Sequence, residues 1–332
     1  MLRTLLRRSA RLGAAAQYAA SPLARHLHVG VVEAPFNRGQ RRLGVEDGPR
    51  AIKDTGVLSE LQNLGVGVLN YGSVEMTECA DSQAGPSGER HHPTVLGYSR
   101  RLASSVAQVV RDGRICLTLG GDHSIAIGTV NGHAQANPDH QVVVLWVDAH
   151  SDINTGSSSG TGNMHGMPVS HHLREMATQV NRLPDNWPQP CISSQHIAYI
   201  GLRDIDKKES EFMKDLGILR FGMRELDQLG VSAVITRCME HLQPSAMRPL
   251  HLSFDIDSLD PMEAPSTGTP VRGGINLREG LNITEAVWKS GLLRALDLVE
   301  VNPHLGTKED AALTADAARL VLLSALSGYR GA

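Results

Sequence analysis

The chain has 332 residues, of which 41% are hydrophobic, and a formal net charge of −3 at pH 7. This length and apolar content suit one large α/β domain, and the near-neutral charge argues against a nucleic-acid-binding protein or a protein that binds anionic membranes. No Pro/Ser-rich linker divides the chain, and no apolar stretch is long enough for a transmembrane helix. The cysteines form no C-x-x-C pair, which argues against a disulfide framework and a structural zinc site; they are Cys79, Cys116, Cys191 and Cys238.

The first 27 residues differ in composition from the rest of the chain. Arginines alternate there with Leu, Ala and Ser, and the first acidic residue is Glu33. Such an Arg-rich, acid-free segment is typical of a mitochondrial transit peptide, and a basic tail without a targeting role is the alternative. We therefore expect residues 1–27 to be a leader to the mitochondrial matrix and residues 28–332 to form a single domain.

From residue 28 onward, short apolar runs alternate with longer segments of helical periodicity. Strands are predicted at 29–32, 66–69, 115–119, 142–147, 197–200, 218–221, 250–254 and 292–299. Helices are predicted after Gly48-Pro49, near Ser124, and at 94–112, 168–180, 207–216, 230–242 and 311–326; residues 75–93 are predicted to form a surface loop whose adjacent histidines, 91 and 92, are solvated. The alternation predicts a three-layer α-β-α fold with a central, mainly parallel sheet.

The predicted strand 142–147 leads directly into three polar residues, Asp148, His150 and Asp152. Side chains two apart on an extended chain point the same way, so the end of a buried strand gathers two carboxylates and an imidazole. Burial of such groups is costly unless something compensates them, and a metal ion is one solution. An Asp-rich turn that caps the next helix is the alternative.

Polar residues follow the carboxyl ends of other predicted strands as well. Parallel sheets bind ligands at this edge, near the point where the strand order reverses. Convergence of several clusters favours a shared site over isolated turns. The further residues are His123 after the third predicted strand, Asp255 and Asp257 after the seventh, and Glu300 after the last.

This set of side chains favours a particular metal. The two imidazoles of His123 and His150 and the four aspartates, 148, 152, 255 and 257, are too many ligands for one ion but suit two ions that share carboxylates. Carboxylate-rich, thiolate-free coordination favours Mn²⁺ over a closed tetrahedral zinc site. Two such ions would hold a bridging water and lower its pKa, which makes a hydroxide nucleophile available.

Four motifs in the chain resemble the signatures of the arginase/agmatinase (ureohydrolase) family, in the family's order and spacing. They are Gly-Gly-Asp122-His123-Ser, Val-Asp148-Ala-His150-Ser-Asp152-Ile-Asn154, Asn163-Met-His165-Gly and Ser-Phe-Asp255-Ile-Asp257-Ser-Leu-Asp260-Pro. Further stretches resemble the arginase branch: 30–36, 201–206, 268–270, 278–281 and 300–303. The resemblance covers roughly residues 28–328 and implies an arginase-like α/β fold.

The resemblance also implies roles for the site residues. His123, Asp148, Asp152 and Asp255 would hold or bridge one Mn²⁺, and His150 and Asp257 would complete the second. His165 would move protons between water, the nucleophile and the leaving amine, for which a near-neutral pKa is suited. Glu300 would accept hydrogen bonds from the substrate guanidinium, with Thr269 assisting by a hydroxyl contact or by orienting Glu300.

Recognition of the amino-acid end separates the members of this family. By the resemblance, the run from Asp204 to Glu209 offers Asp206 to an α-ammonium, and Asn154, Thr161 and Asn163 hydrogen-bond an α-carboxylate. Thr161 stands where many animal arginases carry Ser, and it retains the hydroxyl. Glu209 has an alternative role, in the first turn of a helix.

Because agmatine has no carboxylate, the expected substrate is L-arginine, hydrolysed to L-ornithine and urea by a metal-bridging hydroxide. The alternatives are an agmatinase or another guanidino-acid ureohydrolase, a catalytically silent homologue that binds guanidino compounds, and an amide hydrolase with one zinc ion. Arg278 and Glu279 match a pair at the trimer interface of trimeric relatives, which implies a homotrimer; a surface ion pair on a helix is the alternative.

Overall fold

The computed structural model describes residues 27–77 and 84–329. Apart from Leu27, the predicted leader lies outside the described residues, as does Cys79. Within the described ranges, no helix is both long and apolar enough to cross a bilayer. Cys116 and Cys238 are buried and Cys191 is half-buried, and all three are free thiols.

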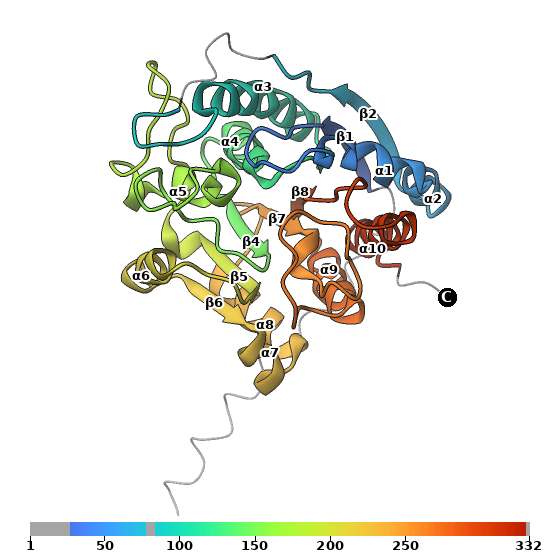
Figure 1. Cartoon of the computed structure of the whole chain (residues 1–332). Coiled ribbons are helices and arrows are strands. Elements are labelled where there is room, and N and C mark those ends of the chain that lie inside the picture. The colour runs from blue at the N-terminus through green and yellow to red at the C-terminus, as the bar shows by residue number, and fades with distance from the viewer. Residues whose placement is uncertain (1–26, 78–83, 330–332) are drawn as a thin grey trace, which may run out of the picture.

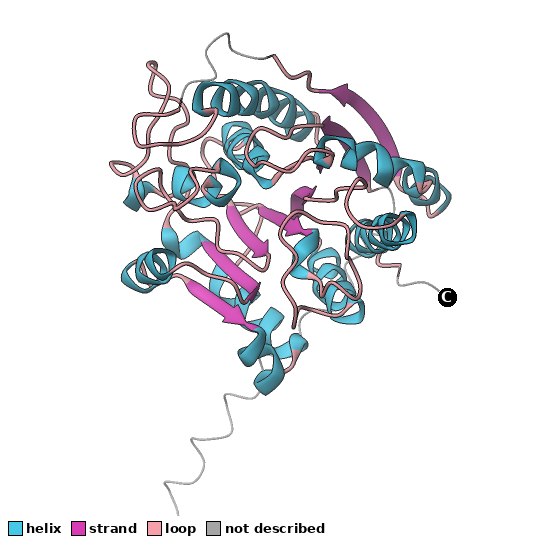
Figure 2. Cartoon of the chain, viewed as in Figure 1, coloured by secondary structure: helices cyan, strands magenta, loops and turns pink. Residues whose placement is uncertain are grey.

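Eight strands form one sheet in which every neighbouring pair is parallel (Figure 2). The spatial order is β2-β1-β3-β8-β7-β4-β5-β6. The strands are β1 His28–Ala34, β2 Gly67–Ser73, β3 Ile115–Gly120, β4 Val143–Val147, β5 Ile197–Leu202, β6 Leu219–Gly222, β7 Leu250–Asp255 and β8 Leu293–Val299. All eight predicted strands are confirmed, and so is the parallel sheet.

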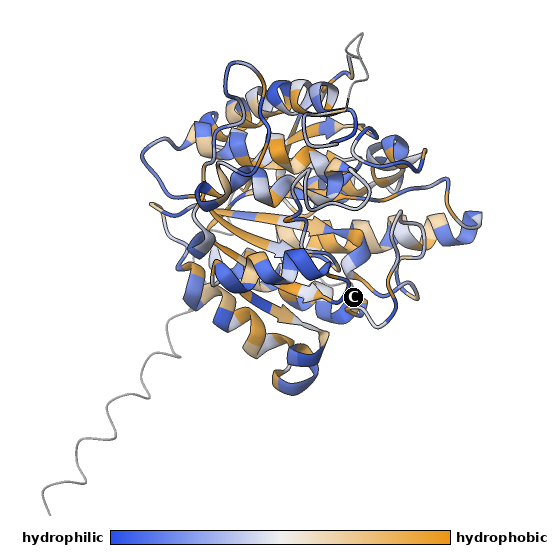
Figure 3. Ribbon diagram, turned by 60° about the vertical axis from the view of Figure 1, so that its left-hand side comes forward, coloured by the Kyte–Doolittle hydropathy of each residue, from blue (hydrophilic) through white to orange (hydrophobic). Residues whose placement is uncertain are grey.

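Helices cover both faces of the sheet, so the three-layer prediction is confirmed (Figure 1). One face carries α1 Gly48–Asp54, α2 Val57–Asn63, α7 Met223–Leu229, α8 Val231–Leu242, α9 Leu277–Ser290 and α10 Lys308–Ser327. The other carries α3 His92–Arg111, α4 Ala126–Ala136, α5 Pro168–His172 and α6 Lys207–Asp215. Figure 3 shows hydrophobic residues concentrated along the strands and on the helix faces that meet them. The core is therefore the pair of interfaces between sheet and helices.

The central strands are apolar on both faces. All five residues of β4 are buried, which explains why the run Val-Val-Leu-Trp-Val reads as continuous rather than alternating hydrophobicity. The helices, in contrast, bury one face; α3 buries Val95, Leu102 and Val106 among others and exposes basic residues on its outer side.

Several element predictions needed correction. The helix predicted at 168–180 ends at His172, because Leu173 is extended and forms a β-bridge to Ile192; a short 3₁₀ turn follows at Arg174–Met176. The helix predicted at 230–242 is α8, and α7 before it was not predicted; Gly230, with φ 77°, separates them.

Two further differences concern α9 and the start of α3. The helix α9 was missed although a capping box marks its start, with Asn276 and Glu279 exchanging backbone hydrogen bonds. His92, expected to be solvated, is 4% exposed as the first residue of α3, and its Nε2 lies 3.2 Å from the Asn181 carbonyl oxygen. The start of α3 is therefore buried rather than solvated.

The strand order determines where polar residues can meet. After β3 the chain skips two places to β4 and later returns with β7 and β8, which fill the gap between them. The strands β3, β8, β7 and β4 are therefore adjacent at the centre of the sheet. Because all run parallel, their carboxyl ends meet at one edge, where this fold class binds ligands.

Candidate active site

Each predicted polar cluster lies at the carboxyl end of one of these four central strands. His123 begins a 3₁₀ turn just after β3, and Asp148 follows β4 directly. Asp255 ends β7, and Glu300 follows β8. The prediction that these clusters converge is confirmed by the geometry described next.

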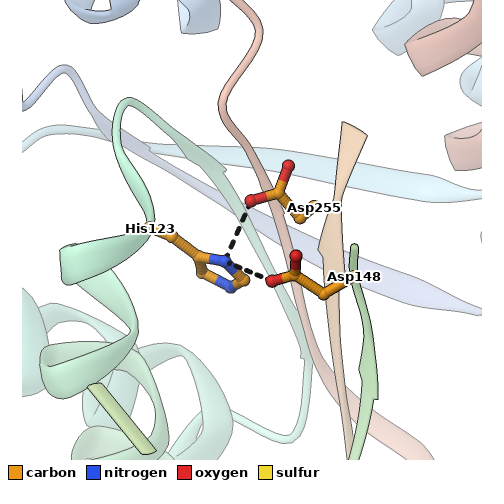
Figure 4. Close-up of side chains that lie close together, drawn as sticks. All are labelled: His123, Asp148 and Asp255. Atoms are coloured by element: carbon orange, nitrogen blue, oxygen red, sulfur yellow. Dashed lines mark ion pairs between the residues drawn. The ribbon is translucent and has the colours of Figure 1, made fainter. Parts of the chain in front are cut away.

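The imidazole of His123 lies at the centre of three carboxylates (Figure 4 shows two of them). Its Nδ1 is 3.1 Å from Asp148 Oδ2, 3.1 Å from Asp152 Oδ2 and 3.0 Å from Asp255 Oδ2. On the opposite side of the ring, Nε2 lies 2.8 Å from the hydroxyl of Ser253. When Nε2–H donates to Ser253, the Nδ1 lone pair faces the carboxylates, which is the tautomer that a metal ligand requires.

A second group shares Asp148 with the first. His150 Nδ1 lies 3.4 Å from Asp148 Oδ1 and 3.3 Å from Asp257 Oδ2. Ligand atoms of His123, Asp148 and Asp255 form one compact set, and those of Asp148, His150 and Asp257 form another. The backbone N–H of His150 donates to Asp148 Oδ1 at 2.7 Å, which fixes the shared carboxylate.

Supporting residues orient the ligands from inside the sheet. The indole Nε1 of Trp146 donates to Asp148 Oδ2 at 2.9 Å, and the Trp146 ring stacks on the His123 ring with centroids 4.3 Å apart. Trp146 and Ser253 were not predicted as site residues. Trp146 lies two residues before Asp148, and Ser253 lies two residues before Asp255. Because side chains alternate along a strand, residues two apart point toward the same face of the sheet.

Negative charge is crowded together in this cluster. Burial, followed by the negative charges of Asp257 and Asp148, raises the pKa of Asp255 well above its usual range. Burial and the charge of Asp148 raise the pKa of Asp152 to about 6. Buried atoms without hydrogen-bond partners include His123 Nδ1 and Asp257 Oδ1. Unpaired nitrogen and oxygen atoms that converge in this way fit divalent cations, which would compensate the crowded carboxylates.

Two site residues adopt strained backbone conformations. Asp152 has φ 50° and Glu300 has φ 63°, in the left-handed region that is uncommon for residues other than glycine. Such conformations persist where the surrounding structure holds them, and they cluster at functional sites. Here they turn both carboxylates toward the centre of the cluster.

Glu300 is buried beside the cluster with one oxygen unused. Its Oε1 accepts from the backbone N–H of His123 at 2.8 Å and lies 3.2 Å from His165 Nδ1, whereas Oε2 has no hydrogen-bond partner. Burial lowers the pKa of His165, but the hydrogen bond to Glu300 and its charge outweigh this and raise the pKa to about 9. Glu300 and His165 were both predicted, and the structure brings them together.

Thr269 contacts the carboxylate of Asp257, not that of Glu300. Its hydroxyl donates to Asp257 Oδ2 at 2.9 Å. In this structure the Thr269 hydroxyl therefore contacts a member of the second group rather than Glu300, and a hydroxyl contact of Thr269 with the substrate stays a prediction.

The predicted amino-acid end lies in loops beside the cluster. Asn154 Nδ2 donates to Asp206 Oδ2 at 3.0 Å, and Ser158 Oγ donates to Asn154 Oδ1 at 2.7 Å. Thr161 is exposed, and its Oγ1 accepts from the backbone N–H of Asn163 at 3.2 Å. The residues expected to meet the α-ammonium and the α-carboxylate are thus within one connected set of loops.

Glu209 has the structural role that was considered as its alternative. Its Oε2 accepts from the backbone N–H of Asp206 at 3.0 Å in a capping box at the start of α6. Its Oε1 accepts from the backbone N–H of Ile153 at 3.1 Å, which ties the helix to the segment after β4. Glu279, predicted at an oligomer interface with Arg278, is likewise part of the capping box of α9.

The chain is similar to known proteins over nearly its whole described length. The model of the Arginase family matches residues 27–327. Hepatic arginase of Aquarana catesbeiana is 45% identical over 305 residues, which cover 91% of this chain and 93% of that protein. Mitochondrial arginase-2 of Homo sapiens is 47% identical over 293 residues, covering 86% and 80% respectively.

Solved structures agree with the sequence comparison. Arginase from Bacillus caldovelox superposes with a TM-score of 0.79 at 34% identity, covering 91% of this chain and 99% of that one. Entamoeba histolytica arginase, solved in complex with L-ornithine, superposes with a TM-score of 0.80 at 30% identity, covering 92% and 100%. From its sequence, its fold and the arrangement of its site, this chain belongs to the arginase family.

Proposed function

We propose that this protein is an arginase, which hydrolyses L-arginine to L-ornithine and urea with two Mn²⁺ ions per chain. The observation that carries the proposal is the pair of imidazole–carboxylate groups that share Asp148, next to a buried Glu300 whose Oε2 is unpaired. The first group supplies one cation site and the second supplies the other, and Glu300 supplies a carboxylate for a guanidinium.

The metal ligands would be His123, Asp148, Asp152 and Asp255 for one ion, and Asp148, His150 and Asp257 for the other. When bound, a pair of divalent ions lowers the pKa of a water molecule and so supplies a nucleophile at neutral pH. Ser253 and Trp146 keep the ligands oriented from within the sheet, and Thr269 does the same for Asp257.

Glu300 binds and orients the reacting group of the substrate. Its free Oε2 accepts hydrogen bonds from the guanidinium, whose planar N–H donors match a carboxylate. Oε1 stays anchored by the backbone N–H of His123, at 2.8 Å, so the carboxylate does not rotate. The guanidinium carbon is thereby held next to the metal ligands, where attack by water oxygen forms the new carbon–oxygen bond.

His165 carries protons in this scheme. It is half-buried beside Glu300 and therefore reaches both the site and bulk water. The charge of Glu300 favours its protonated form, which suits proton donation to the nitrogen that leaves as the amine of ornithine when the carbon–nitrogen bond breaks. The proton that the attacking water loses passes to solvent, and solvent returns a proton to His165 for the next turnover.

The α-amino and α-carboxylate groups would bind in the loops that follow β4 and β5. Asp206 is exposed next to Asn154 and presents a carboxylate to the α-ammonium. Asn154, Thr161 and Asn163 provide neutral donors for the α-carboxylate. These contacts distinguish arginine from agmatine, which lacks the carboxylate.

The direct test compares urea release from L-arginine and from agmatine, using Mn²⁺-loaded protein whose metal content is measured on the same sample. We expect kcat/KM for arginine to exceed that for agmatine by at least about a hundredfold. Agmatine has no α-carboxylate, so the protein groups that donate hydrogen bonds to it would be left unpaired. Preference for agmatine would identify an agmatinase instead. A folded, metal-loaded protein that releases urea from neither substrate would be a silent homologue.

We further propose that residues 1–27 direct the protein to the mitochondrial matrix. The support is the composition of this segment and the similarity of the chain to mitochondrial arginase-2 of human, rat and mouse. Its similarity to arginase-1 of cattle and human makes a direct test necessary. Residues 1–30 fused to a fluorescent protein are expected to reach mitochondria, and diffuse cytosolic fluorescence would contradict this.

A homotrimer in which Arg278 lies at the interface is our proposal for the assembly. Its support is the resemblance of residues 278–281 to trimeric relatives. Light scattering after size-exclusion chromatography should give about three times the mass of one mature chain. An Arg278→Ala variant should lower that mass, whereas a monomeric wild-type protein would contradict the proposal.

A further inference from the structure

The loop at residues 155–163 carries two of the proposed α-carboxylate donors, yet much of it faces solvent. Ser157, Gly160 and Thr161 are exposed. Hydrogen bonds within the loop form a turn, in which Ser158 and Ser159 backbone N–H groups both donate to the Thr155 carbonyl oxygen at 3.1 and 3.0 Å. An exposed turn of this kind needs an outside contact to keep its position relative to the metal cluster.

A second segment, residues 85–90 before α3, supplies such contacts. The backbone N–H of Arg90 donates to the Gly162 carbonyl oxygen at 2.7 Å, between Thr161 and Asn163. Gly162 has φ 72°, and a Cβ at this position would lie only 2.3 Å from the Gly88 carbonyl oxygen. The two backbones therefore approach so closely that a side chain at Gly162 would separate them.

The other end of the loop packs on the carboxylate of Glu89. A Cβ at Gly156 would lie 2.3 Å from both Cδ and Oε1 of Glu89. Glu89 is only 1% exposed, and such complete burial is unusual for a glutamate. Both ends of the 155–163 loop thus contact Glu89 or its immediate neighbours.

Neutral donors hold the Glu89 carboxylate in place. Asn181 Nδ2 donates to Oε1 at 2.6 Å, and the Ser87 backbone N–H donates to Oε2 at 3.0 Å. Asn181 also donates to Ser87 Oγ at 3.0 Å, and its carbonyl oxygen lies 3.2 Å from His92 Nε2. Three segments, 85–92, 155–163 and the region of Asn181, are therefore connected through one buried carboxylate.

We propose that Glu89 is a positioning residue for substrate recognition: it holds the 155–163 loop so that Thr161 and Asn163 can bind the α-carboxylate of the substrate. This inference rests on the proposed function, because it assigns the loop to the amino-acid end of arginine. Glu89 acts through the loop and touches neither the metal ligands nor the guanidinium side of the site. Its loss therefore affects the affinity for a ligand that carries an α-carboxylate, and leaves the chemical step intact.

The test uses the full-length, Mn²⁺-loaded protein with a Glu89→Ala variant. We expect KM for arginine to rise about 5- to 10-fold with kcat within about twofold of wild type, since the loss of buried hydrogen bonds loosens the loop. The Kd of L-ornithine should rise by a similar factor, whereas the Kd of putrescine, which is ornithine without its carboxylate, should not change. A structural defect with no role in recognition would weaken both ligands equally.

Two further variants keep the test decisive. Asn181→Ala removes a donor to Glu89 and leaves the glutamate in place, so it should shift ornithine affinity in the same direction even where Glu89→Ala fails to fold. Glu60→Ala is the matched control: it removes a carboxylate that pairs with Arg319 Nη1 at 2.7 Å between α2 and α10, and it should change neither KM nor the ornithine Kd.

The outcomes separate this inference from the proposed function. Urea release by wild type with unchanged KM and ornithine Kd in both Glu89→Ala and Asn181→Ala would overturn the role of Glu89 alone. Equal losses for ornithine and putrescine would overturn it as well. Absence of urea release from arginine by the metal-loaded wild type would overturn the proposed function, and this inference with it.

Discussion

The two ends of the site are built in different ways. The proposed metal end consists of side chains at the ends of β3, β4 and β7; His123, Asp148 and Asp255 are all at most 3% exposed. The amino-acid end consists of loops, in which Thr161 and Asp206 are exposed. The first is held by the sheet and the second by contacts between loops.

This difference matches the demands of the proposed reaction. Metal ligands must converge within a fraction of an ångström, and strand termini packed in a core provide that precision. Binding of the α-amino and α-carboxylate groups requires access from solvent. Surface loops provide this access, and they are more mobile than strands. We therefore expect substitutions at the metal end to abolish the chemistry, and substitutions at the amino-acid end to weaken binding.

The largest effect is expected for Asp148→Ala, because Asp148 belongs to both metal-ligand groups. Loss of this carboxylate should lower kcat/KM for arginine at least about a thousandfold and reduce the Mn²⁺ content. Urea release and elemental analysis of the same sample measure both quantities. Asp139→Ala, which removes an exposed aspartate outside the site, is the control. Retention of two ions by Asp148→Ala would show that the two cations do not share Asp148.

The second effect concerns Glu300→Gln, which keeps the shape of the side chain but removes its charge. The guanidinium would lose its anionic partner, so kcat/KM should fall by about a hundredfold or more. The Mn²⁺ content should stay at the wild-type value, since Glu300 is not among the ligand groups. If instead the metal were lost and the affinity for arginine unchanged, Glu300 would belong to the metal end.

A smaller effect is expected for Asp206→Ala at the amino-acid end. Removal of one charged contact to the α-ammonium should raise KM for arginine by about tenfold, with kcat nearly unchanged. Steady-state kinetics separate the two parameters. The neighbouring Lys207→Ala provides a control on the same exposed turn. A fall in kcat with constant KM would show that this loop takes part in the chemical step.

The smallest effect on activity is expected for a substitution of His172, the buried last residue of α5. Burial, with the charges of His171 and His251, lowers the pKa of His172 to about 3 from 6.5. Below pH 6.5 the unfolded chain therefore binds a proton that the folded chain excludes, so stability falls as pH drops from 6.5 toward 3.

His172→Gln removes this linkage while retaining an acceptor near Asn131 Nδ2, which lies 3.4 Å from His172 Nδ1. We expect the free energy of unfolding to lose about 1.4 kcal/mol less per pH unit in the variant than in wild type between pH 6 and 4. Urea denaturation at several pH values gives both slopes. Activity at neutral pH should remain within about twofold of wild type. Identical slopes would assign the acid sensitivity to other groups.

Much of the metal end could be predicted from the sequence for a simple reason. Asp148, His150 and Asp152 follow a buried strand directly, and parallel strands bring Asp255 and Glu300 to the same edge of the sheet. The polar motif after each strand can be read locally, and the shared edge follows from the fold class. Ser253 could have been predicted by the alternation of side chains along a strand, since it lies two residues before Asp255 in β7.

The loop contacts could not be predicted in this way. Glu89 lies in a stretch rich in Gly, Pro and polar residues, which is typical of a solvated loop, yet it is buried against Gly156. Its burial depends on Asn181, some ninety positions away in the chain, and no periodicity links the two. Likewise, the early end of α5 depends on the bridge between Leu173 and Ile192, which is a tertiary contact.

The ends of β3, β4 and β7 are expected to hold two cations that share Asp148. Calorimetric titration of metal-free protein with Mn²⁺ tests this expectation most directly. We expect two ions per chain, with urea release from arginine restored as the sites fill. A single ion per chain in protein that hydrolyses arginine at its full rate would contradict it.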